Sequence, residues 1–464
     1  MSVVEELAGF VERASFEALS SAARLQLKIR VLDALGCAIG ALGADVPRRV
    51  RAYTAAAYDG GPCTYLGGGR GAPDQAALLN GALVRYLDFN DSYLAPGETC
   101  HPSDNLAAVL AAAELANADG RTLLAALAAA YQVQCRLSDT APVRQRGFDH
   151  TTHLAYSAAA GAARALGLDA ARTANAIAMS GTALNALRVT RTGALSHWKG
   201  LAAPFAASSA LRTVLLARHG ITGPLGVFEG NKGFTEAIAG PFRIDWAHED
   251  LERVTQTILK RFDAEIHSQT AIQAALDLRA AHGFKASAIA MVELDVFDVA
   301  YRIIGGGEEG DKTLVITKED ADHSLPYLIA VALLDGTVMP AQYTPARIQR
   351  ADVQELLCRV MVRPRRSYSR RFPEEMMSRV TVVLRDGREF TTERRDYPGF
   401  RTNATSWSDA LVKFTALASP HAPAEVLAEL TSAVETLEGI QVRELTRLLE
   451  LAVAPARRLS TTAA

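Results

Sequence analysis

Residues 120–131 read GRTLLAALAAAY, and this stretch decides the fold of the first half of the chain. Its large side chains recur at the three- and four-residue spacing of one helix face: Leu123, Leu124, Leu127 and Tyr131. The same Ala- and Leu-rich pattern, ended by Gly or Asp-Gly, runs from about residue 16 to residue 220. Because alanine lets neighbouring helices approach closely, the pattern predicts a packed helical bundle.

The pattern changes after about His267, where alternation with a period of two replaces the helical spacing. This alternation predicts half-buried strands around residues 292–296 and 380–384, and Asp386-Gly387 is typical of a tight hairpin. Helical stretches near residues 318–334 and 353–358 lie between the strands. The mixture predicts a smaller α+β domain.

Amphipathic helical spacing returns from about Ser406 to Leu451. We therefore expect a mainly α fold, with a large all-α helical domain and C-terminal helices that pack back onto it. The expected boundaries are a helical domain at 1–266, an α+β domain at 267–400, returning helices at 401–455 and a disordered tail at 456–464.

Composition narrows the classes of partner. The 464 residues include 49 Lys and Arg against 51 Asp and Glu, and neither sign forms a long run. This balance argues against a nucleic-acid or membrane-surface partner, since both favour a concentrated basic face. The five cysteines are far apart, the start is acidic and amphipathic, and no apolar run approaches the roughly 18–20 residues of a spanning helix. We expect a cytoplasmic protein.

The densest polar cluster is LDFNDSY at residues 87–93, followed by a Pro/Gly loop and HPSDN at residues 101–105. Residues 75–87 have a helical pattern, so Asp88 and Ser92 are expected about one turn apart at its C-terminal end. Pro102 is expected to begin the next helix, with His101 at its mouth. Two carboxylates, a hydroxyl and an imidazole would then gather there, although Asp and Ser also cap helices for purely structural reasons.

Two further segments hold candidate site residues. His150 and His153 are three apart, but no HExxH pattern or nearby carboxylate or cysteine completes a metal site, so we expect no metal. We interpret His150 as an acid or base and His153 as structural. Arg188 and Arg191, also three apart, form either a clamp for a substrate carboxylate or a solvated face.

The remaining candidates are cations and rings in apolar surroundings. Lys199 and Lys260 each lie beside an aromatic residue, and His267 opens an amphipathic helix. His323 and Tyr327 are four apart and would share a helical face. The alternative for each of these residues is a purely structural role, as a surface lysine or as a hydrogen-bonded group of the core. No GxGxxG or Walker loop is present, so no nucleotide cofactor is expected.

Taken together, these segments resemble the MmgE/PrpD family over nearly the whole chain. The resemblance is carried by RVLDALG (30–36), NG (80–81), LDFNDS (87–92), HPSDN (101–105), DH (149–150), WKG (198–200), FEG (228–230), HSQT (267–270) and DH (322–323). It implies a helical domain, an α+β lid, a site between them, a homodimer, and no cofactor or metal. The implied activity is a lyase that dehydrates a small 3-hydroxy polycarboxylate, with 2-methylcitrate as the favoured substrate.

Carried over by position, the family's site residues fall on Asp88, Ser92, His101, His150, Lys199, Lys260, His267 and Tyr327. We expect Lys199, Lys260 and His101 to bind carboxylates and stabilise developing charge. We expect His150, Asp88 and Tyr327 to move protons. A decarboxylase or an epimerase acting on a related polycarboxylate remains an alternative, and a non-catalytic binding protein is a weaker one.

Overall fold

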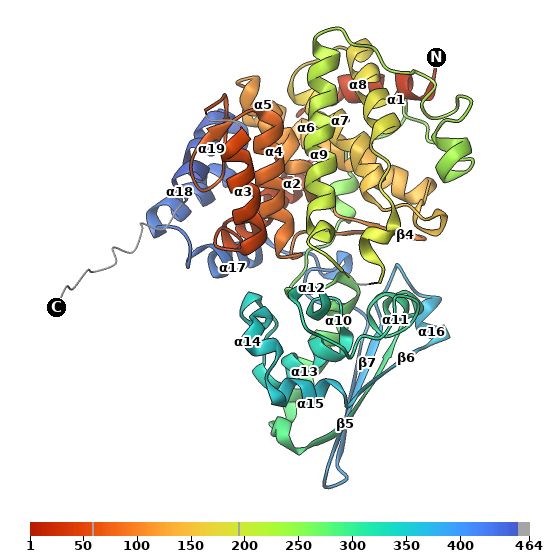
Figure 1. Ribbon diagram of the computed structural model, residues 1–464, viewed down its shortest axis with the longest axis vertical. Helices are drawn as coiled ribbons and strands as arrows, with labels where there is room; N and C mark the ends of the chain where they lie inside the picture. Colours follow the sequence, from red (N-terminus) through yellow and green to blue (C-terminus); the bar gives the residue numbers. More distant parts are fainter. Residues whose placement is uncertain (58–59, 194, 453–464) are drawn as a thin grey trace, which may run out of the picture.

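The computed structural model describes residues 1–57, 60–193 and 195–452, and the predicted tail at 456–464 lies outside them. The first nine α-helices pack into one body, the upper part of Figure 1. They are α1 (Val3–Arg13), α2 (Ser21–Gly40), α3 (Asp45–Ala57), α4 (Pro73–Tyr86), α5 (Leu106–Leu115), α6 (Gly120–Thr140), α7 (Thr151–Ala165), α8 (Ala170–Ala183) and α9 (Trp198–Arg218). The predicted helical half is confirmed.

Local sequence signals fix where these helices begin and how closely they pack. Ser20 and Asp119 cap α2 and α6, because their side chains accept hydrogen bonds from Ala23 and Thr122 amides. Small residues at the crossings allow close approach. A Cβ added at Gly161 of α7 would lie 2.7 Å from Val109 Cγ2, which is closer than real contacts allow.

Helix α9 corrects one expectation from the sequence. By length and composition it is apolar enough to cross a membrane, and within the described residues it is the one helix of that kind. However, 56% of the apolar window is buried inside the protein, against α4, α7 and α8. Its apolar character therefore reflects packing in the core, because a core helix can be as long and as apolar as a membrane-spanning helix.

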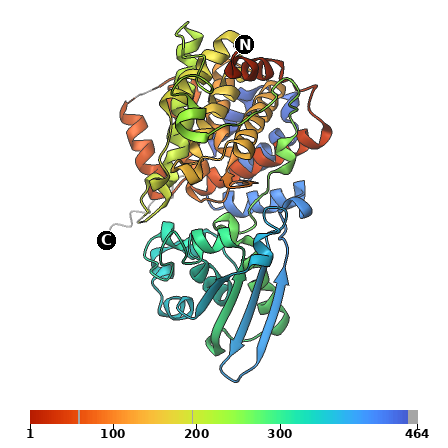
Figure 2. The same cartoon turned by 90° about the vertical axis from the view of Figure 1, so that its right-hand side faces the viewer.

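The second body, the lower part of Figures 1 and 2, contains the predicted sheet. Its strands are β5 (Ile289–Val296), β6 (Val360–Pro364), β7 (Ser378–Leu384) and β8 (Glu389–Arg394), in the order β6-β5-β7-β8. The two predicted strands pair antiparallel, with Val292 opposite Val382, and the predicted hairpin joins β7 to β8. Strand β6 was not predicted. It runs parallel to β5 and has only one buried residue, Val360, so its sequence lacks a clear alternation.

Short helices cover this sheet: α10 (Gln269–His282), α11 (Asp298–Ile304), α12 (Lys318–Ala321), α13 (Leu325–Asp335), α14 (Pro345–Ile348), α15 (Ala351–Leu357) and α16 (Arg366–Ser369). The predicted helix at 318–334 is wrong as a single element. It is broken between α12 and α13, because Ser324 caps a new helix that has Pro326 in its first turn.

The chain then returns to the first body through α17 (Trp407–Ala418), α18 (Ala424–Glu435) and α19 (Val442–Leu451). Their apolar residues join the core of α1–α9, while residues 258–400 form a separate core with Leu94. The expected return of the C-terminal helices is therefore confirmed. Helix α17 lies at the junction of the two bodies (Figures 1 and 2).

The chain passes between the two bodies twice, near Leu259 and near Gly399, and these two segments lie side by side. The amide of Leu259 donates to the carbonyl of Gly399 over 3.0 Å. Gly399 has φ of 118°, and an added Cβ would lie 2.3 Å from the Leu259 oxygen, so only glycine fits there. A second tie comes from the hairpin of β3 (Tyr93–Ala95) and β4 (Glu98–Cys100), because Ser92 pairs with Ile258.

Candidate active site

A cavity of about 50 Å³ lies between the two bodies, next to the hairpin. The first body contributes the end of α4, the hairpin, the residues just before the short helix η1 (Pro102–Asn105) and before α7, Arg144, and the short helix η3 (Arg188–Arg191). The junction and the second body contribute residues 260–267, Ile303, Glu309 and His323. Most of the lining is ionisable: Arg85, Asp88, Glu98, His101, Arg144, His150, Arg188, Arg191, Lys260, Glu265, His267, Glu309 and His323.

Asp88 lies at the centre of the cations. It follows α4 with φ of 58°, so it does not continue the helix, and Ser92 does not lie one turn away on it as expected. One carboxylate oxygen lies 2.7 Å from Lys260 Nζ and also accepts from Arg85. Burial alone would raise the pKa of Asp88, but Arg85, Lys260 and Lys199 lower it well below its usual value. Asp88 is therefore a fixed anion and a weak base.

Lys199, in the first turn of α9, lies behind Asp88. Its ammonium is 2.8 Å from Asp322 Oδ1 and 3.5 Å from Asp88 Oδ2. Burial lowers the pKa of Lys199, against the opposing effect of Asp322. His323 Nδ1 lies 2.9 Å from this ammonium and 2.6 Å from Asp322, so it either accepts from the first or donates to the second.

His101 precedes η1, as expected, and is held in one tautomer. Its Nδ1 lies 2.8 Å from the carbonyl oxygen of Asp91, which can only accept, so Nδ1 carries the hydrogen. Ser92 Oγ lies 3.1 Å from the same nitrogen. Burial, reinforced by Arg85 and Lys260, holds the pKa of His101 well below its usual value. The ring is therefore neutral, with the lone pair on Nε2.

His150 caps α7 and contacts His101 edge to face, with ring centroids 5.3 Å apart. Its Nδ1 lies 3.4 Å from Asp149 Oδ1, and its Nε2 is buried with no hydrogen-bond partner among the described residues. Burial keeps the pKa of His150 well below its usual value, although Asp149 opposes the effect. His150 is therefore a second neutral imidazole. His153 has the structural place expected, with its Nε2–H donating to Ala141 over 2.9 Å.

The two predicted arginines bind carboxylates of the protein itself. Arg191 forms a bidentate pair with Asp149, with the shorter contact at 2.6 Å. Arg188 lies 2.7 Å from Glu309, which also contacts Arg144 at 3.3 Å. Glu309 belongs to the glycine-rich loop between α11 and α12. A carboxylate of the second body therefore forms ion pairs with two arginines of the first.

His267 lies in η6 (Ile266–Ser268), immediately before α10. Its Nδ1 is 2.6 Å from Glu265 Oε1, and its Nε2 is buried without a partner among the residues the structure describes. Burial would raise the pKa of Glu265, but His267 lowers it to about 2, so the carboxylate is ionised. An ionised carboxylate only accepts hydrogen bonds, so Nδ1 of His267 donates to it.

Tyr327 is the predicted site residue that the structure does not bring to the cavity. It lies inside α13, and its hydroxyl donates to the backbone carbonyl of Gln342. The expectation that it shares a helical face with His323 is wrong, because α13 begins only at Leu325. The buried phenol therefore belongs to the core of the second body.

The other predicted residues come together. Asp88, His101, His150, Arg188, Arg191, Lys260 and His267 line the cavity, while Lys199 and Ser92 contact Asp88 and His101. The sequence prediction missed Arg85, Glu98, Arg144, Glu265 and Glu309. The spacing of Arg85 from Asp88 and of Glu265 from His267 was a usable signal. No local signal marks Glu309, whose partner Arg188 is 121 residues away.

One group of side chains has a metal-like arrangement. Ligand atoms of Asp88, Asp322 and His323 lie within 4.8 Å of one another. However, the two carboxylates already contact ammonium groups: Lys260 lies 2.7 Å from Asp88, and Lys318 lies 2.7 Å from Asp322. The donor set therefore suits lysines better than a divalent ion, which would have to displace them.

Comparison with known proteins identifies the family of the chain. Residues 5–247 match the MmgE/PrpD N-terminal domain, and residues 262–438 match the MmgE/PrpD C-terminal domain. The chain is 30% identical over 404 residues to 2-methylcitrate dehydratase of Cupriavidus necator, covering 80% of this chain and 81% of that protein. It is 30% identical to the Escherichia coli K12 enzyme of the same name, covering 70% and 71%.

A relative with a different activity matches more of the chain at lower identity. Cis-aconitate decarboxylase of Mus musculus is 25% identical over 476 residues, covering 97% of this chain and 93% of that protein. The two domain matches together span most of the chain, and they divide near the junction seen in the structure. This chain belongs to the MmgE/PrpD family.

Proposed function

We propose that this protein is a carbon–oxygen lyase that removes water from a small 3-hydroxy polycarboxylate without a cofactor. The observation that carries the proposal is the arrangement of three imidazoles around a cation-lined cavity. In His101, His150 and His267, Nδ1 faces an oxygen of the protein, and the Nε2 atoms of His150 and His267 are buried without partners among the described residues. Buried polar atoms of this kind mark a place where a ligand completes the hydrogen bonds.

His150 is the proposed base. Its neutral ring has an unpartnered Nε2, so this nitrogen can take the proton from the carbon next to a substrate carboxylate. Lys260 and the arginines at the cavity stabilise the negative charge that develops on that carboxylate. Asp88 takes no proton in this scheme. It holds Lys260 and Lys199 in place, which revises the role expected from the sequence.

His267 is the proposed acid. Its Nδ1 is fixed by the hydrogen bond to Glu265, and its Nε2 has no partner among the described residues, so in the proposed step Nε2 donates a proton to the departing hydroxyl. As the C–O bond breaks, the electrons of the C–H bond form the double bond and water leaves. After this step His150 holds the proton taken from carbon, and His267 has given its own proton to the leaving hydroxyl. Proton exchange with solvent restores both rings when the product leaves.

The cavity size requires the two bodies to move. About 50 Å³ accommodates one or two water molecules, whereas sites for small ligands usually enclose roughly 300 Å³ or more. The salt bridges from Arg188 and Arg144 to Glu309 hold the second body against the first. We propose that the second body acts as a lid, and that a substrate carboxylate replaces Glu309 on these arginines.

The substrate we propose is 2-methylcitrate, dehydrated to 2-methyl-cis-aconitate. The support is the similarity to the 2-methylcitrate dehydratases of Cupriavidus necator and Escherichia coli, at 30% identity. Decarboxylation of cis-aconitate is the second candidate, favoured by the 97% coverage in the match to the mouse enzyme. Epimerisation of a related polycarboxylate is a third candidate.

Incubation of the purified protein with 2-methylcitrate, citrate and cis-aconitate tests the proposal. We expect 2-methylcitrate to lose the mass of one water and to gain an absorbing double bond. Release of CO2 from cis-aconitate, with 2-methylcitrate unchanged, would replace dehydration by decarboxylation. Dialysis against a chelator should leave turnover unchanged, since Asp88 and Asp322, the carboxylates of the metal-like group, are already paired with lysines.

A homodimer in the cytoplasm is also part of the proposal. The support for a dimer is a set of exposed large apolar side chains at the start of α9, including Trp198 (46%) and Phe205 (47%), whose rings lie 5.4 Å apart. Sedimentation velocity tests the dimer, and a monomer at micromolar concentration would contradict it.

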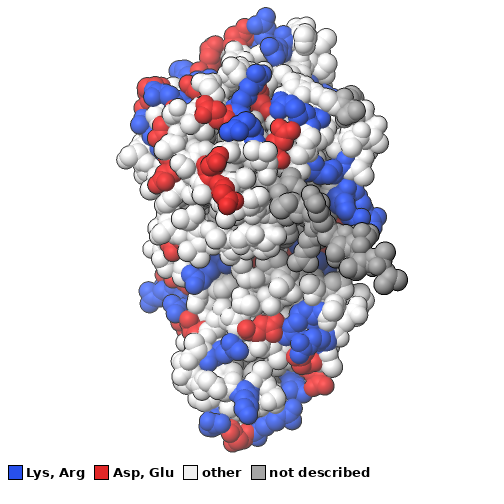
Figure 3. All heavy atoms as spheres, turned by 90° about the vertical axis from the view of Figure 1, so that its left-hand side faces the viewer, with Lys and Arg blue, Asp and Glu red and all other residues white. Residues whose placement is uncertain are grey.

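The surface charge bears on the other partners. On the face shown in Figure 3, Lys and Arg are interspersed with Asp and Glu, which favours a small-molecule partner over a polyanion.

A further inference from the structure

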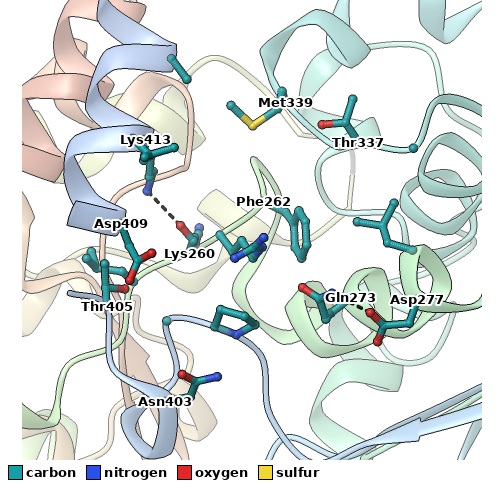
Figure 4. Close-up of a pocket in the computed structure, with 18 of the residues that line it drawn as sticks. Lys260, Phe262, Gln273, Asp277, Thr337, Met339, Asn403, Thr405, Asp409 and Lys413 are labelled. Atoms are coloured by element: carbon teal, nitrogen blue, oxygen red, sulfur yellow. Dashed lines mark hydrogen bonds between the residues drawn. The ribbon is translucent and has the colours of Figure 1, made fainter. Parts of the chain in front are cut away.

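A second, larger cavity of about 790 Å³ shares Lys260 with the proposed active site. Figure 4 shows it between α17, the segment containing Phe262, and α10. Lys413 reaches from α17 toward the backbone of Lys260, and the dashed line marks their hydrogen bond. The wall between the two cavities is thus held by a residue that the reaction scheme does not use.

Lys413 makes four contacts at once. Its ammonium donates to the carbonyl of Phe89 over 2.7 Å and to the carbonyl of Lys260 over 3.0 Å. It also lies 2.7 Å from Asp33 Oδ1 and 3.8 Å from the centre of the Phe89 ring. Asp33 is 1% exposed, and its carboxylate pairs with the Lys413 ammonium. The ammonium therefore donates to the two carbonyls while Asp33 neutralises its charge.

The two carbonyls belong to the segments that carry the central ion pair of the site. Phe89 follows Asp88, whose left-handed backbone at φ of 58° is strained for a residue with a side chain. Lys260 is itself the partner of Asp88, at 2.7 Å. One ammonium thus fixes the backbone on both sides of this pair.

The RVLDALG motif at residues 30–36 supports the same segments. Arg30 donates to the Thr257 carbonyl over 2.7 Å, three residues before Lys260. Asp33 pairs with Lys413. A Cβ added at Gly36 would lie 3.2 Å from Phe414 Cα, so glycine allows α17 to approach α2. Three residues on one face of α2 therefore place the catalytic segment and the lysine that holds it.

We propose that Lys413 is a positioning residue, which acts from the returning helix α17 to hold the Asp88 and Lys260 backbones in the geometry that catalysis needs. Asp33 is its counter-ion. The inference rests on the proposed function for its turnover readout. A displacement of about 1 Å at a reacting group costs roughly 100-fold in rate, so loss of this lysine affects kcat more than substrate affinity.

The test compares Lys413→Met, Lys413→Arg and the double variant Asp33→Asn/Lys413→Met. The double variant removes both charges together, so it avoids the unpaired buried carboxylate that destabilises the single variant. We expect kcat to fall about 10- to 100-fold in both Met variants, with KM changed less than three-fold, and partial recovery in the Arg variant. A folded double variant with wild-type kcat would overturn the proposal.

Lys28→Ala is the matched control. Lys28 also links α2 to the C-terminal helices, through Glu438 at 2.7 Å and the Glu435 carbonyl at 2.8 Å, but it touches neither catalytic segment. Its kcat should equal that of the wild type. An equal loss in Lys28→Ala would show that general loosening of the C-terminal helices is responsible, and would reject positioning by Lys413.

A readout without substrate separates this inference from the proposed function. Ser92 and Ile258 exchange two backbone hydrogen bonds, of 2.9 and 2.8 Å, beside the tethered segments. Their amides should exchange with deuterium faster in the Met variants and unchanged in Lys28→Ala. Faster exchange with no turnover of any substrate by the wild type would retain the tether and reject the proposed reaction. Unchanged exchange in the folded double variant would reject the tether.

The large cavity also allows rescue by a small amine. The Lys413 side chain is 12% exposed and lines the cavity, so propylammonium can reach the space left in Lys413→Ala. We expect added propylammonium to raise kcat of Lys413→Ala several-fold, and to leave Lys28→Ala unchanged. Equal activation of both variants would count against a specific ammonium at this position.

Discussion

The two cavities that share Lys260 differ in size and in chemistry. The larger has about 790 Å³ and is lined by a mixture of apolar and polar residues such as Phe262, Met339 and Thr405. The smaller has about 50 Å³, and its lining includes His101, His150, His267 and His323. Because histidine is the most frequent general acid or base and the larger cavity has none among the described residues that line it, we assign the proposed reaction to the smaller cavity, although volume alone would choose the larger.

Removal of the proposed base gives the sharpest test of this contrast. His150→Gln should lower kcat roughly 10²- to 10⁴-fold, because general base catalysis contributes about that much. His153→Gln is the control one turn further along α7. It breaks the bond to Ala141 and should cost about 1–3 kcal/mol of stability with little change in kcat. Thr405→Ala, in the larger cavity, should leave turnover unchanged. Steady-state kinetics and thermal melts measure all three, and equal kcat losses would erase the distinction between the cavities.

Lys199→Ala tests the cations behind the smaller cavity. From the sequence we expected Lys199 to bind a substrate carboxylate, but it lies between two buried carboxylates of the protein, Asp322 and Asp88. Its removal should therefore lower stability by about 3–5 kcal/mol as well as nearly abolish turnover. Chemical unfolding measures the first effect. Lys199→Ala/Asp322→Asn should recover much of the stability without the activity, and recovery of both would make Lys199 purely structural.

Acid should destabilise the protein through its buried histidines. Burial lowers the pKa of His153 to about 4 and holds those of His101 and His150 well below their usual value, whereas unfolded histidine titrates near 6.5. The unfolded state therefore takes up protons first as the pH falls. Stability is full above pH 6.5 and falls between about pH 6.5 and 4, by roughly 1.4 kcal/mol per pH unit for each histidine.

Unfolding free energies at several pH values in that window measure this dependence. His153→Gln should reduce the slope of unfolding free energy against pH, because it removes one of these three histidines while the cavity keeps the other two.

The pH dependence of activity tests the same lowered pKa values. His150, the proposed base, stays deprotonated in this range, so kcat/KM should not fall between pH 8 and pH 6.5. A fall with a midpoint near 6.5 would mean that an ordinary, solvated histidine is the base.

Tyr327→Phe should have the smallest effect. The hydroxyl donates to the Gln342 carbonyl inside the second body, so its loss should cost about 1 kcal/mol of stability and leave kcat within a few-fold. The resemblance to the MmgE/PrpD family had suggested that Tyr327 takes part in proton transfer. A 100-fold loss of kcat, with stability unchanged, would show that the ring turns into the cavity when substrate binds.

The sequence predicted those features that depend on neighbours along the chain. Periodicity placed the bundle, strands β5 and β7 and the hairpin after β7, because each pattern repeats within a few residues. The start of α13 was readable too, since Ser324 and Pro326 are strong helix-start signals. This reading would have separated Tyr327 from His323.

The partners within the site were harder to predict because they are distant in sequence. Arg188 binds Glu309 at a separation of 121 residues, and Lys413 binds the Phe89 carbonyl at a separation of 324. Neither pair has a pattern that a single sequence reveals. Tertiary packing also decides that Asp88 is a fixed anion, because Arg85, Lys260 and Lys199 meet there only after folding.

The return of the last helices also bears on the order in which the protein is made. The first core needs α17–α19, whereas the second core is contained within residues 258–400 apart from Leu94. During synthesis, therefore, the later core has nearly all its residues before the earlier one is complete. Until α17 leaves the ribosome, the face of α2 with Asp33 and Gly36 lacks its cover, and this half of the nascent chain is the one most in need of a chaperone.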